Sequence, residues 1–162
     1  IGQKIGKVAN SLGMVIHYHN RSKLDTGKEN GAIYHKTLES LMAVSDVLSV
    51  CCPASKETIN LINKKTISLL PNGAIVTNVA RGDIVDDDAL IEALDSKKVS
   101  AVGLDVYKNE PKLNPGYLKH GRAFVLPHLG SATFETRTAM ANLAIDNISE
   151  FFETGSCKNK VN

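Results

Sequence analysis

The amino-acid sequence predicts an α/β fold built around a parallel β-sheet. Five short, continuous apolar runs alternate along the chain with segments in which apolar residues recur every three or four positions. This alternation is typical of strands separated by helices. Because the runs are not interrupted by polar residues at every second position, we expect a sheet covered by helices on both faces. Polar or small residues follow each run, which indicates loops at the strand ends.

Length and composition are those of a single globular domain. The chain has 162 residues, which is roughly one domain at about 150 residues each. Its 43% hydrophobic and 22% charged residues are typical of globular proteins. The formal net charge is only +2, without a long run of one sign, so we expect binding to neither nucleic acid nor membrane surfaces. No apolar stretch approaches the ~20 residues that cross a bilayer.

The first half of the chain contains two predicted helices and two predicted strands. An apolar stripe indicates a helix before Gly13, and residues 14–18 form the first predicted strand. Thr37 is placed to cap a helix that continues to Val44, and residues 47–51 form the second strand. The opening stripe consists of Ile1, Ile5, Val8, Ala9 and Leu12.

The second half repeats this order twice and ends with a strand and a long helix. A helix over residues 64–70 ends at Pro71-Asn72-Gly73 and precedes a strand over 74–79. Asp86 is placed to cap a helix over 87–95, and the next strand spans 101–106. After a loop over 108–122, a strand over 123–126 precedes a long helix over 133–153.

The cysteine and histidine content predicts neither a disulfide framework nor a metal site. Cys51, Cys52 and Cys157 form no disulfide pattern, so we expect a reducing, cytoplasmic location. His17 and His19 share a strand face, but without Cys or carboxylate residues nearby we expect no metal there. The chain begins at Ile1 without an initiator Met or an export signal, and we expect it to be the C-terminal part of a longer protein.

Candidate ligand-binding residues lie after the predicted strands. Parallel sheets bind ligands at the carboxyl ends of their strands, because helix starts and loops form a crevice there. The five segments at this edge are residues 20–22, 52–53, 78–82, 105–107 and 127–131. They contain Arg81, Asp105 and His128. Each residue alone is commonly structural, but together they indicate a polar site.

Three motifs at this edge resemble those of the D-isomer-specific 2-hydroxyacid dehydrogenases, and the similarity extends over essentially the whole chain. The motifs are Asn78-Val79-Ala80-Arg81-Gly82 followed by Asp86-Asp87-Asp88-Ala89-Leu90, Gly103-Leu104-Asp105-Val106 with Glu110-Pro111, and Pro127-His128-Leu129-Gly130-Ser131-Ala132-Thr133. The segment His19-Asn20-Arg21-Ser22 is most similar to the glyoxylate and hydroxypyruvate reductases.

The resemblance implies a Rossmann-type, doubly wound parallel sheet whose first strand and N-terminal substrate domain lie outside this chain. Residues 1–132 then form an incomplete NAD(P)-binding domain. Residues 133–162 form a C-terminal helix and tail that return toward the substrate domain. We expect the 162-residue piece alone to be inactive and the complete protein to be a homodimer.

The resemblance also implies hydride transfer from NAD(P)H to a small 2-oxo acid, such as glyoxylate or hydroxypyruvate, to give the D-2-hydroxy acid. Arg81 is then the substrate-binding arginine, Glu110 the acidic partner and His128 the acid/base. A guanidinium can hold a carboxylate through two hydrogen bonds. An imidazole titrates near working pH, and a carboxylate on its other nitrogen favours the imidazolium.

The expected coenzyme is NADP(H), with NAD(H) possible. Ile1-Gly2 resembles the end of the glycine-rich dinucleotide fingerprint. Asn20 and Arg21 stand where NAD-preferring members have an acidic residue, and an arginine can pair with a 2′-phosphate. The remaining residues that the resemblance assigns to the coenzyme are Ser22, Cys52, Pro53, Thr58, Val79, Ala80, Asp105, Gly130 and Ser131, together with Arg81 and His128.

Other functions within the same family remain open at this point. The family includes transcriptional corepressors that bind dinucleotides and keep Arg, Glu and His at these positions. D-lactate and phosphoglycerate dehydrogenases are further alternatives, because the residues that select the substrate lie largely outside this segment. Formate dehydrogenases fit less well, since they typically have Gln where this chain has Glu110.

Overall fold

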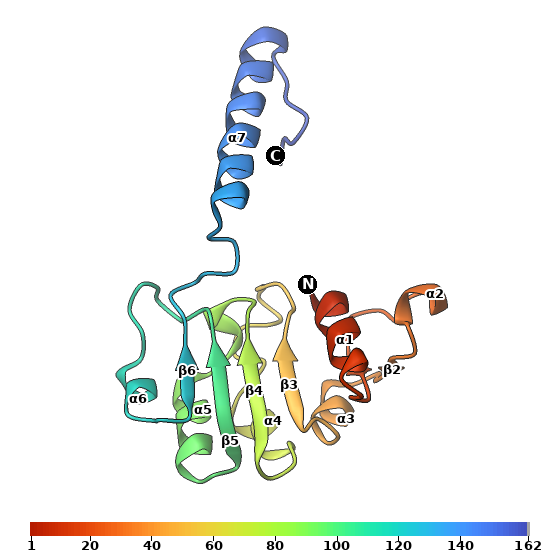
Figure 1. Cartoon of the computed structure of the whole chain (residues 1–162), viewed down its shortest axis with the longest axis vertical. Helices are drawn as coiled ribbons and strands as arrows, with labels where there is room; N and C mark the ends of the chain where they lie inside the picture. The colour runs from red at the N-terminus through yellow and green to blue at the C-terminus, as the bar shows by residue number, and fades with distance from the viewer. Residues whose placement is uncertain (162) are drawn as a thin grey trace. The chain divides into compact units, whose positions relative to one another are not determined.

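The computed structural model describes residues 1–161; Asn162, the last residue of the expected tail, lies outside the described residues. The chain divides into two compact units, Ile1–Pro127 and His128–Asn162. The strands of the described part belong to the first unit, and the second contains one long helix, α7 (Phe134–Thr154) (Figure 1). None of the helices in residues 1–161 is long and apolar enough to span a membrane.

The first part of the chain forms a small two-stranded parallel sheet. The elements of this part of the chain are α1 (Gly2–Ser11), β1 (His17–Tyr18), α2 (Thr26–Glu29), β2 (Ile33–Tyr34) and α3 (Leu38–Met42). β1 pairs in parallel with β2, and it is shorter than the strand predicted over 14–18. α2 and β2 were not predicted, because segments of four and two residues are too short to show a period.

A four-stranded parallel sheet forms the centre of the first unit. Its strands are β3 (Val47–Val50), β4 (Ala74–Asn78), β5 (Val99–Leu104) and β6 (Ala123–Val125), which lie in this order. The connections contain α4 (Lys64–Ser68), a 3₁₀ turn over Gly82–Ile84, α5 (Asp87–Asp95) and α6 (Pro115–Leu118). The predicted α/β fold with parallel strands is confirmed, and α6 is an additional helix inside the predicted loop 108–122.

Side-chain caps begin several of the helices. The Thr37 hydroxyl accepts a hydrogen bond from the Ser40 amide at 3.2 Å, and the Asp86 carboxylate accepts one from the Ala89 amide at 3.2 Å. Both caps were predicted from the sequence. Such caps satisfy amide groups that have no partner inside the helix and contribute about 1 kcal/mol each.

The hydrophobic core lies between the central sheet and the helices that cover one of its faces. Figure 1 shows α4 and α5 behind the sheet. Val76 of β4, Val99 of β5, and Leu90 and Leu94 of α5 are all 0% exposed. Burying a side chain of this size contributes about 1.5–3 kcal/mol, so this face holds the unit together.

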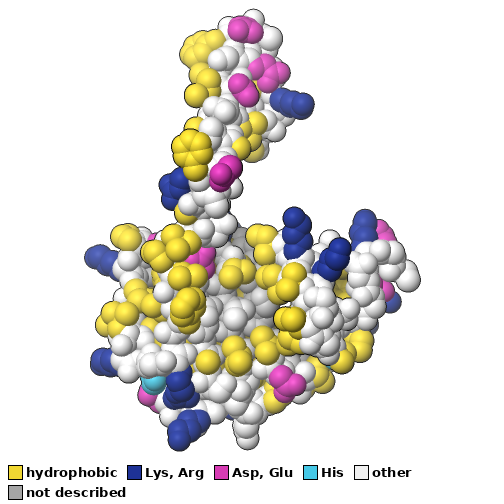
Figure 2. Space-filling model, viewed as in Figure 1, with side chains coloured by type: hydrophobic (Ala, Val, Ile, Leu, Met, Phe, Trp, Pro, Cys, Tyr) yellow, Lys and Arg dark blue, Asp and Glu magenta, His cyan; other side chains and the backbone are white. Residues whose placement is uncertain are grey.

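The sheet differs from the sequence-based expectation in two details. The described strands form two sheets with six strands in total, in place of one sheet with five. Within Ile1–Pro127 only one face of the central sheet is covered by helices, because Val47, Ile75 and Phe124 on its other face are 41%, 37% and 67% exposed. Figure 2 shows hydrophobic side chains on that face. Doubly wound sheets commonly have the strand order 3-2-1-4-5-6. If β2, β1 and β3 correspond to strands 3, 2 and 4 of that order, one further strand fits between β1 and β3.

Candidate active site

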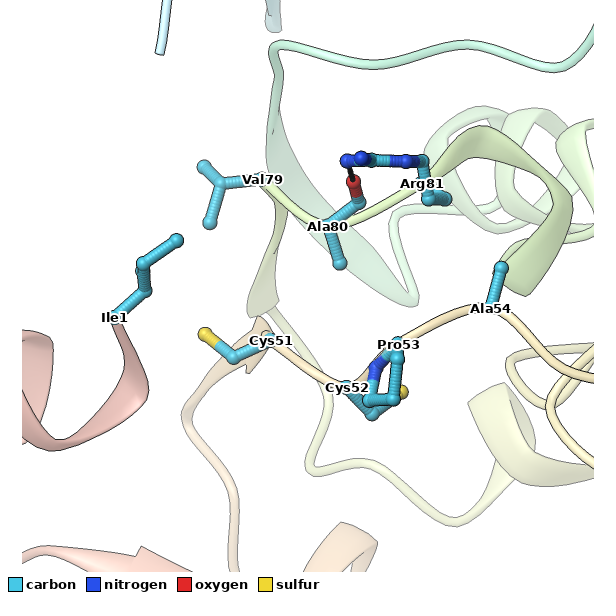
Figure 3. Close-up of a pocket in the computed structure, with 8 residues that line it drawn as sticks. All are labelled: Ile1, Cys51, Cys52, Pro53, Ala54, Val79, Ala80 and Arg81. Atoms are coloured by element: carbon cyan, nitrogen blue, oxygen red, sulfur yellow. Dashed lines mark hydrogen bonds between the residues drawn. The ribbon is translucent and has the colours of Figure 1, made fainter. Parts of the chain in front are cut away.

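A pocket of about 420 Å³ opens at the carboxyl ends of β3 and β4 (Figure 3). Most of its wall is apolar and neutral, and one cation, Arg81, belongs to it. Its lining residues are Ile1, Cys51, Cys52, Pro53, Ala54, Val79, Ala80 and Arg81. Six of them are residues that the family resemblance assigns to coenzyme or substrate; Cys51 and Ala54 are additional. A neutral wall with an arginine suits an anionic ligand.

The start of α1 lies close to this pocket. Ile1 lines the pocket and precedes the first helical residue, Gly2. A Cβ atom at Gly2 would lie 3.4 Å from the Cβ atom of Cys51, so the helix begins against the end of β3. The first amides of a helix lack intrahelical acceptors and can bind anions. Amides at the start of α1 therefore lie at the edge of the pocket.

The two neighbouring cysteines are oriented differently. In Figure 3 the Cys51 sulfur points toward Ile1, whereas the Cys52 sulfur lies on the far side of the chain beside Pro53. Burial raises the pKa of the Cys52 thiol. Successive residues of an extended chain point to opposite sides, so the two thiols are directed differently. Cys51 was not among the predicted site residues.

Arg81 follows β4 in a turn that a buried side chain closes. The Asn78 side-chain amide donates to the Arg81 carbonyl oxygen at 2.9 Å and accepts from the Ala80 amide at 3.0 Å. The guanidinium is exposed and donates to the Ala80 carbonyl oxygen at 2.6 Å. Asn78 is 1% exposed and was not among the predicted site residues, because its contacts depend on the shape of the turn.

The ends of β5 and β6 hold the loop that contains Glu110. The Tyr107 amide donates to Glu110 Oε1 at 2.9 Å. The Tyr107 hydroxyl donates to the Leu126 carbonyl oxygen at 2.5 Å and lies 3.0 Å from the Leu104 carbonyl oxygen. Asp105, 7% exposed, donates its backbone amide to the Asn78 carbonyl oxygen at 3.1 Å. The loops after β4 and β5 are therefore linked at their bases.

Several of the residues assigned to the coenzyme do not line the pocket, among them the residues after β1 and Thr58. Asn20, Arg21 and Ser22 follow β1 and are exposed. Thr58 closes the loop after β3, since its hydroxyl donates to the Pro53 carbonyl oxygen at 2.9 Å and accepts from the Ser55 amide at 2.7 Å. Their roles in binding the coenzyme stay predictions.

His128, Gly130 and Ser131 belong to the second unit. His128 has a φ of 55°, in the left-handed region that non-glycine residues rarely adopt. The approach of His128 to Arg81 and Glu110 stays a prediction from the sequence.

The histidines after β1 and β2 contact one another. His17 Nδ1 lies 2.9 Å from His35 Nε2, and His19 Nδ1 lies 2.9 Å from the His35 carbonyl oxygen. Across residues 1–161, no group of three or more His, Cys, Asp or Glu side chains is arranged to hold a metal ion. These histidines therefore link two neighbouring strands.

Comparisons with known proteins agree with this geometry. Residues 1–130 match the family described as D-isomer specific 2-hydroxyacid dehydrogenase, NAD binding domain. The chain is 39% identical over 155 residues to 4-methyl-2-oxopentanoate reductase A of Aspergillus oryzae, covering 96% of this chain and 47% of that protein. It is 40% identical over 152 residues to a glyoxylate reductase of Pyrococcus furiosus, covering 93% of this chain and 45% of that protein.

A solved structure is also similar along nearly the whole chain. The NADPH-dependent glyoxylate/hydroxypyruvate reductase of Sinorhizobium meliloti, in complex with NADP and malonate, aligns with a TM-score of 0.92 and 34% identity. The alignment covers 99% of this chain and 50% of that one. The chain thus spans about half the length of the relatives it matches. Its parallel sheet, its Arg81 turn and the family match show that the chain belongs to the D-isomer specific 2-hydroxyacid dehydrogenases, within their NAD-binding domain.

Proposed function

We propose that the protein containing this chain reduces a small 2-oxo acid, glyoxylate or hydroxypyruvate, to the D-2-hydroxy acid with NADPH. The observation that best supports this proposal is the position of Arg81 in a pocket with neutral walls at the carboxyl edge of the sheet. In such a wall a single guanidinium provides the attraction for an anionic substrate.

Arg81 binds the substrate. Its planar guanidinium holds the carboxylate of a 2-oxo acid through paired hydrogen bonds and polarises the neighbouring ketone. Its present contact with the Ala80 carbonyl oxygen, at 2.6 Å, involves one nitrogen, Nη1. The remaining guanidinium N–H groups can donate to the substrate.

His128 supplies the proton of the reaction, and Glu110 orients His128. His128 donates a proton to the oxygen of the former ketone, because an imidazolium is a suitable acid near neutral pH. Glu110 accepts a hydrogen bond from the other ring nitrogen, which favours the protonated imidazole and fixes its orientation. The hydrogen bond from the Tyr107 amide to Glu110 Oε1, at 2.9 Å, holds that carboxylate in place.

The pocket and its surroundings fit a dinucleotide. When bound, the reduced nicotinamide supplies the hydride for the ketone carbon. The amides at the start of α1 hold a phosphate group, and the small side chains of Val79 and Ala80 leave room for a ring beside Arg81. Asp105, Thr58, Gly130 and Ser131 complete the proposed binding surface.

NADP(H) is the proposed coenzyme because of the residues after β1. Asn20 has no charge to repel a 2′-phosphate, and Arg21 is exposed and able to pair with it. Ser22 adds a hydroxyl donor beside them. The reductase of Sinorhizobium meliloti, described as NADPH-dependent, is one of the similar structures and supports this choice.

The experiment that tests the function is a coenzyme-coupled assay with the complete protein. NADPH and NADH absorbance is followed with glyoxylate, hydroxypyruvate and pyruvate, beside a His128→Gln variant and a His120→Gln variant as the matched control. His120 lies between α6 and β6, before the amino end of the last strand, and pairs with Asp95 at 3.3 Å. We expect turnover that His128→Gln abolishes and His120→Gln retains.

Three results would contradict parts of the proposal. Tight dinucleotide binding without turnover of any 2-oxo acid would favour a corepressor-like binding protein. Equal or better catalytic efficiency with NADH would contradict the role of Asn20 and Arg21, and a preference for pyruvate would favour a D-lactate dehydrogenase.

Further proposals concern the whole protein. We propose a division into an NAD(P)-binding domain over 1–132 and a C-terminal helix and tail over 133–162, a homodimer, and an inactive isolated piece. Light scattering of the complete protein and an assay of the 162-residue chain test the last two. The three cysteines, which are all free thiols, support a reducing, cytoplasmic location.

A further inference from the structure

Asn78 is a buried polar residue at the end of β4, where the backbone turns toward Arg81. It is 1% exposed, and the polar atoms of its side chain are satisfied inside the turn that follows it. A buried amide is costly unless its donor and its acceptor are both bonded. The geometry of residues 78–81 therefore depends on this one side chain.

The two hydrogen bonds of Asn78 join groups on either side of one peptide bond. Its Nδ2 donates to the Arg81 carbonyl oxygen at 2.9 Å, and its Oδ1 accepts from the Ala80 amide at 3.0 Å. The Asn78 carbonyl oxygen accepts from the Asp105 amide at 3.1 Å, which anchors the turn to the end of β5. The backbone of Arg81 is thus connected to two strands.

The residue after Arg81 has no freedom to shift toward the neighbouring loop. A Cβ atom at Gly82 would lie 1.9 Å from the carbonyl carbon of Tyr107 and 2.1 Å from the Lys108 nitrogen. The main chain is therefore in close contact on this side. Arg81 is therefore fixed on both sides. The Asn78 side chain bonds its carbonyl oxygen, and the next residue, Gly82, packs against the Tyr107 backbone.

We propose that Asn78 is a positioning residue for Arg81: it holds the backbone from which the guanidinium reaches the 2-oxo acid, and so sets the affinity for the substrate carboxylate. This inference rests on the proposed function of Arg81. An error of about 1 Å in the placement of a binding group can cost about 100-fold in rate. The side chain has this effect without touching the substrate.

Two substitutions separate the donor of Asn78 from its acceptor. Asn78→Ala removes both hydrogen bonds. Asn78→Asp keeps an oxygen for the Ala80 amide but places a second oxygen against the Arg81 carbonyl oxygen, so the turn loses its closing bond. When the introduced carboxyl is protonated it becomes a donor again. Acid should therefore restore the turn in Asn78→Asp and not in Asn78→Ala.

The first test is steady-state kinetics of the complete protein with glyoxylate and saturating NADPH. We expect the KM for glyoxylate to rise about tenfold in both variants at pH 8. As the pH falls, the KM of Asn78→Asp should approach the KM of the unaltered protein. The KM of Asn78→Ala should stay about tenfold higher than that of the unaltered protein. Val76→Ala, on the same strand and 0% exposed, is the control for lost stability and should leave the KM unchanged.

The second test does not need activity. Trypsin cleaves after arginine, and cleavage of a folded protein requires local opening. The Arg81-Gly82 bond should be cut at least tenfold faster in Asn78→Ala than in Val76→Ala under native conditions, as followed by mass spectrometry of the fragments. A chemical-denaturation curve of each variant shows how far global stability differs.

The outcomes distinguish this inference from the proposed function. A protein that turns over glyoxylate, but whose KM and Arg81-Gly82 cleavage are the same in the Asn78 variants and in Val76→Ala, would overturn the positioning role. A protein that turns over no 2-oxo acid, yet shows the accelerated cleavage in Asn78→Ala, would overturn the substrate role of Arg81 and leave the structural coupling intact.

Discussion

The backbone amide of Tyr107 donates a hydrogen bond of 2.9 Å to a carboxylate oxygen of Glu110. The same tyrosine contacts the ends of β5 and β6 through its hydroxyl, and its backbone lies against Gly82. One residue therefore joins the loop of the proposed acidic partner to the turn of the proposed substrate-binding arginine.

Gly82→Ala should disrupt both loops. The new methyl group would lie 1.9 Å from the Tyr107 carbonyl carbon, a backbone atom that cannot rotate away. We expect a loss of about 1–3 kcal/mol in the free energy of unfolding, measured with urea, and a large fall in kcat/KM. Gly121→Ala is the control, because nothing lies within 4 Å of a Cβ atom there. Equal unfolding free energies for the two variants would contradict the prediction.

Tyr107→Phe should loosen the ends of β5 and β6. Burial raises the pKa of the Tyr107 phenol above its ordinary value, so the hydroxyl is a donor at all physiological pH values. Without the hydroxyl, the Leu126 carbonyl oxygen loses the hydrogen bond that it accepts at 2.5 Å. This loss should reduce the free energy of unfolding by about 1–3 kcal/mol. Tyr34→Phe, whose hydroxyl bond to Asn20 is 3.4 Å long and exposed, should change it by less than about 0.5 kcal/mol.

Acid should weaken the contact between β1 and β2. Burial, followed by the charges of His17 and His19, lowers the pKa of His35 from its ordinary 6.5. The unfolded chain then binds a proton at His35 more readily than the folded chain does. The contribution of neutral His35 to the free energy of unfolding is therefore complete above about pH 6.5. It is lost as the pH falls through the pKa of His35 in the folded protein. Two protonated rings could not share the His17 to His35 hydrogen bond, because one nitrogen must accept.

Urea unfolding of the complete protein at pH 7.5 and pH 5 measures this effect. His35→Asn should reduce the difference in unfolding free energy between the two pH values, because it removes the group whose pKa changes on folding. His120→Asn should retain the difference. If His35→Asn and the unaltered protein lose the same stability in acid, the proposed cause is wrong.

Glu57→Gln should strengthen NADPH binding. The Ser55 hydroxyl, then the Glu57 amide, and more weakly the Arg21 cation lower the pKa of Glu57, so this carboxylate attracts the side chain proposed to bind the 2′-phosphate. Removing an exposed charge has a small effect, and we expect the NADPH dissociation constant to fall about two- to threefold at low salt. The NADH constant should not change.

Fluorescence titration of the complete protein with each coenzyme tests this prediction. Glu92→Gln, which removes an exposed ion pair with Lys64 on the helices behind the sheet, is the charge-matched control. A gain of affinity for both coenzymes, or an equal gain in Glu92→Gln, would exclude a specific effect on Arg21.

Local features of the fold could be predicted from the sequence because their causes are close in the chain. The helix over Asp87–Asp95 was predicted with its bounds, since Asp86 caps it and its apolar residues follow one period. Val79, Ala80 and Arg81 were assigned to one site because they follow a strand of a parallel sheet, and they share a pocket. β2 was missed, because two residues show no period.

The α/β order of elements, the helix caps and the edge of the sheet where the candidate residues gather follow from the sequence alone. The tertiary structure was needed to show how the two cysteine side chains are oriented, why residue 82 has no side chain, and what the Asn78 amide binds. The close contact of Gly82 with Tyr107 joins residues that are distant in the chain. Such contacts depend on the packing of neighbouring strands and on the path of each loop, and neither leaves a local pattern in the residues.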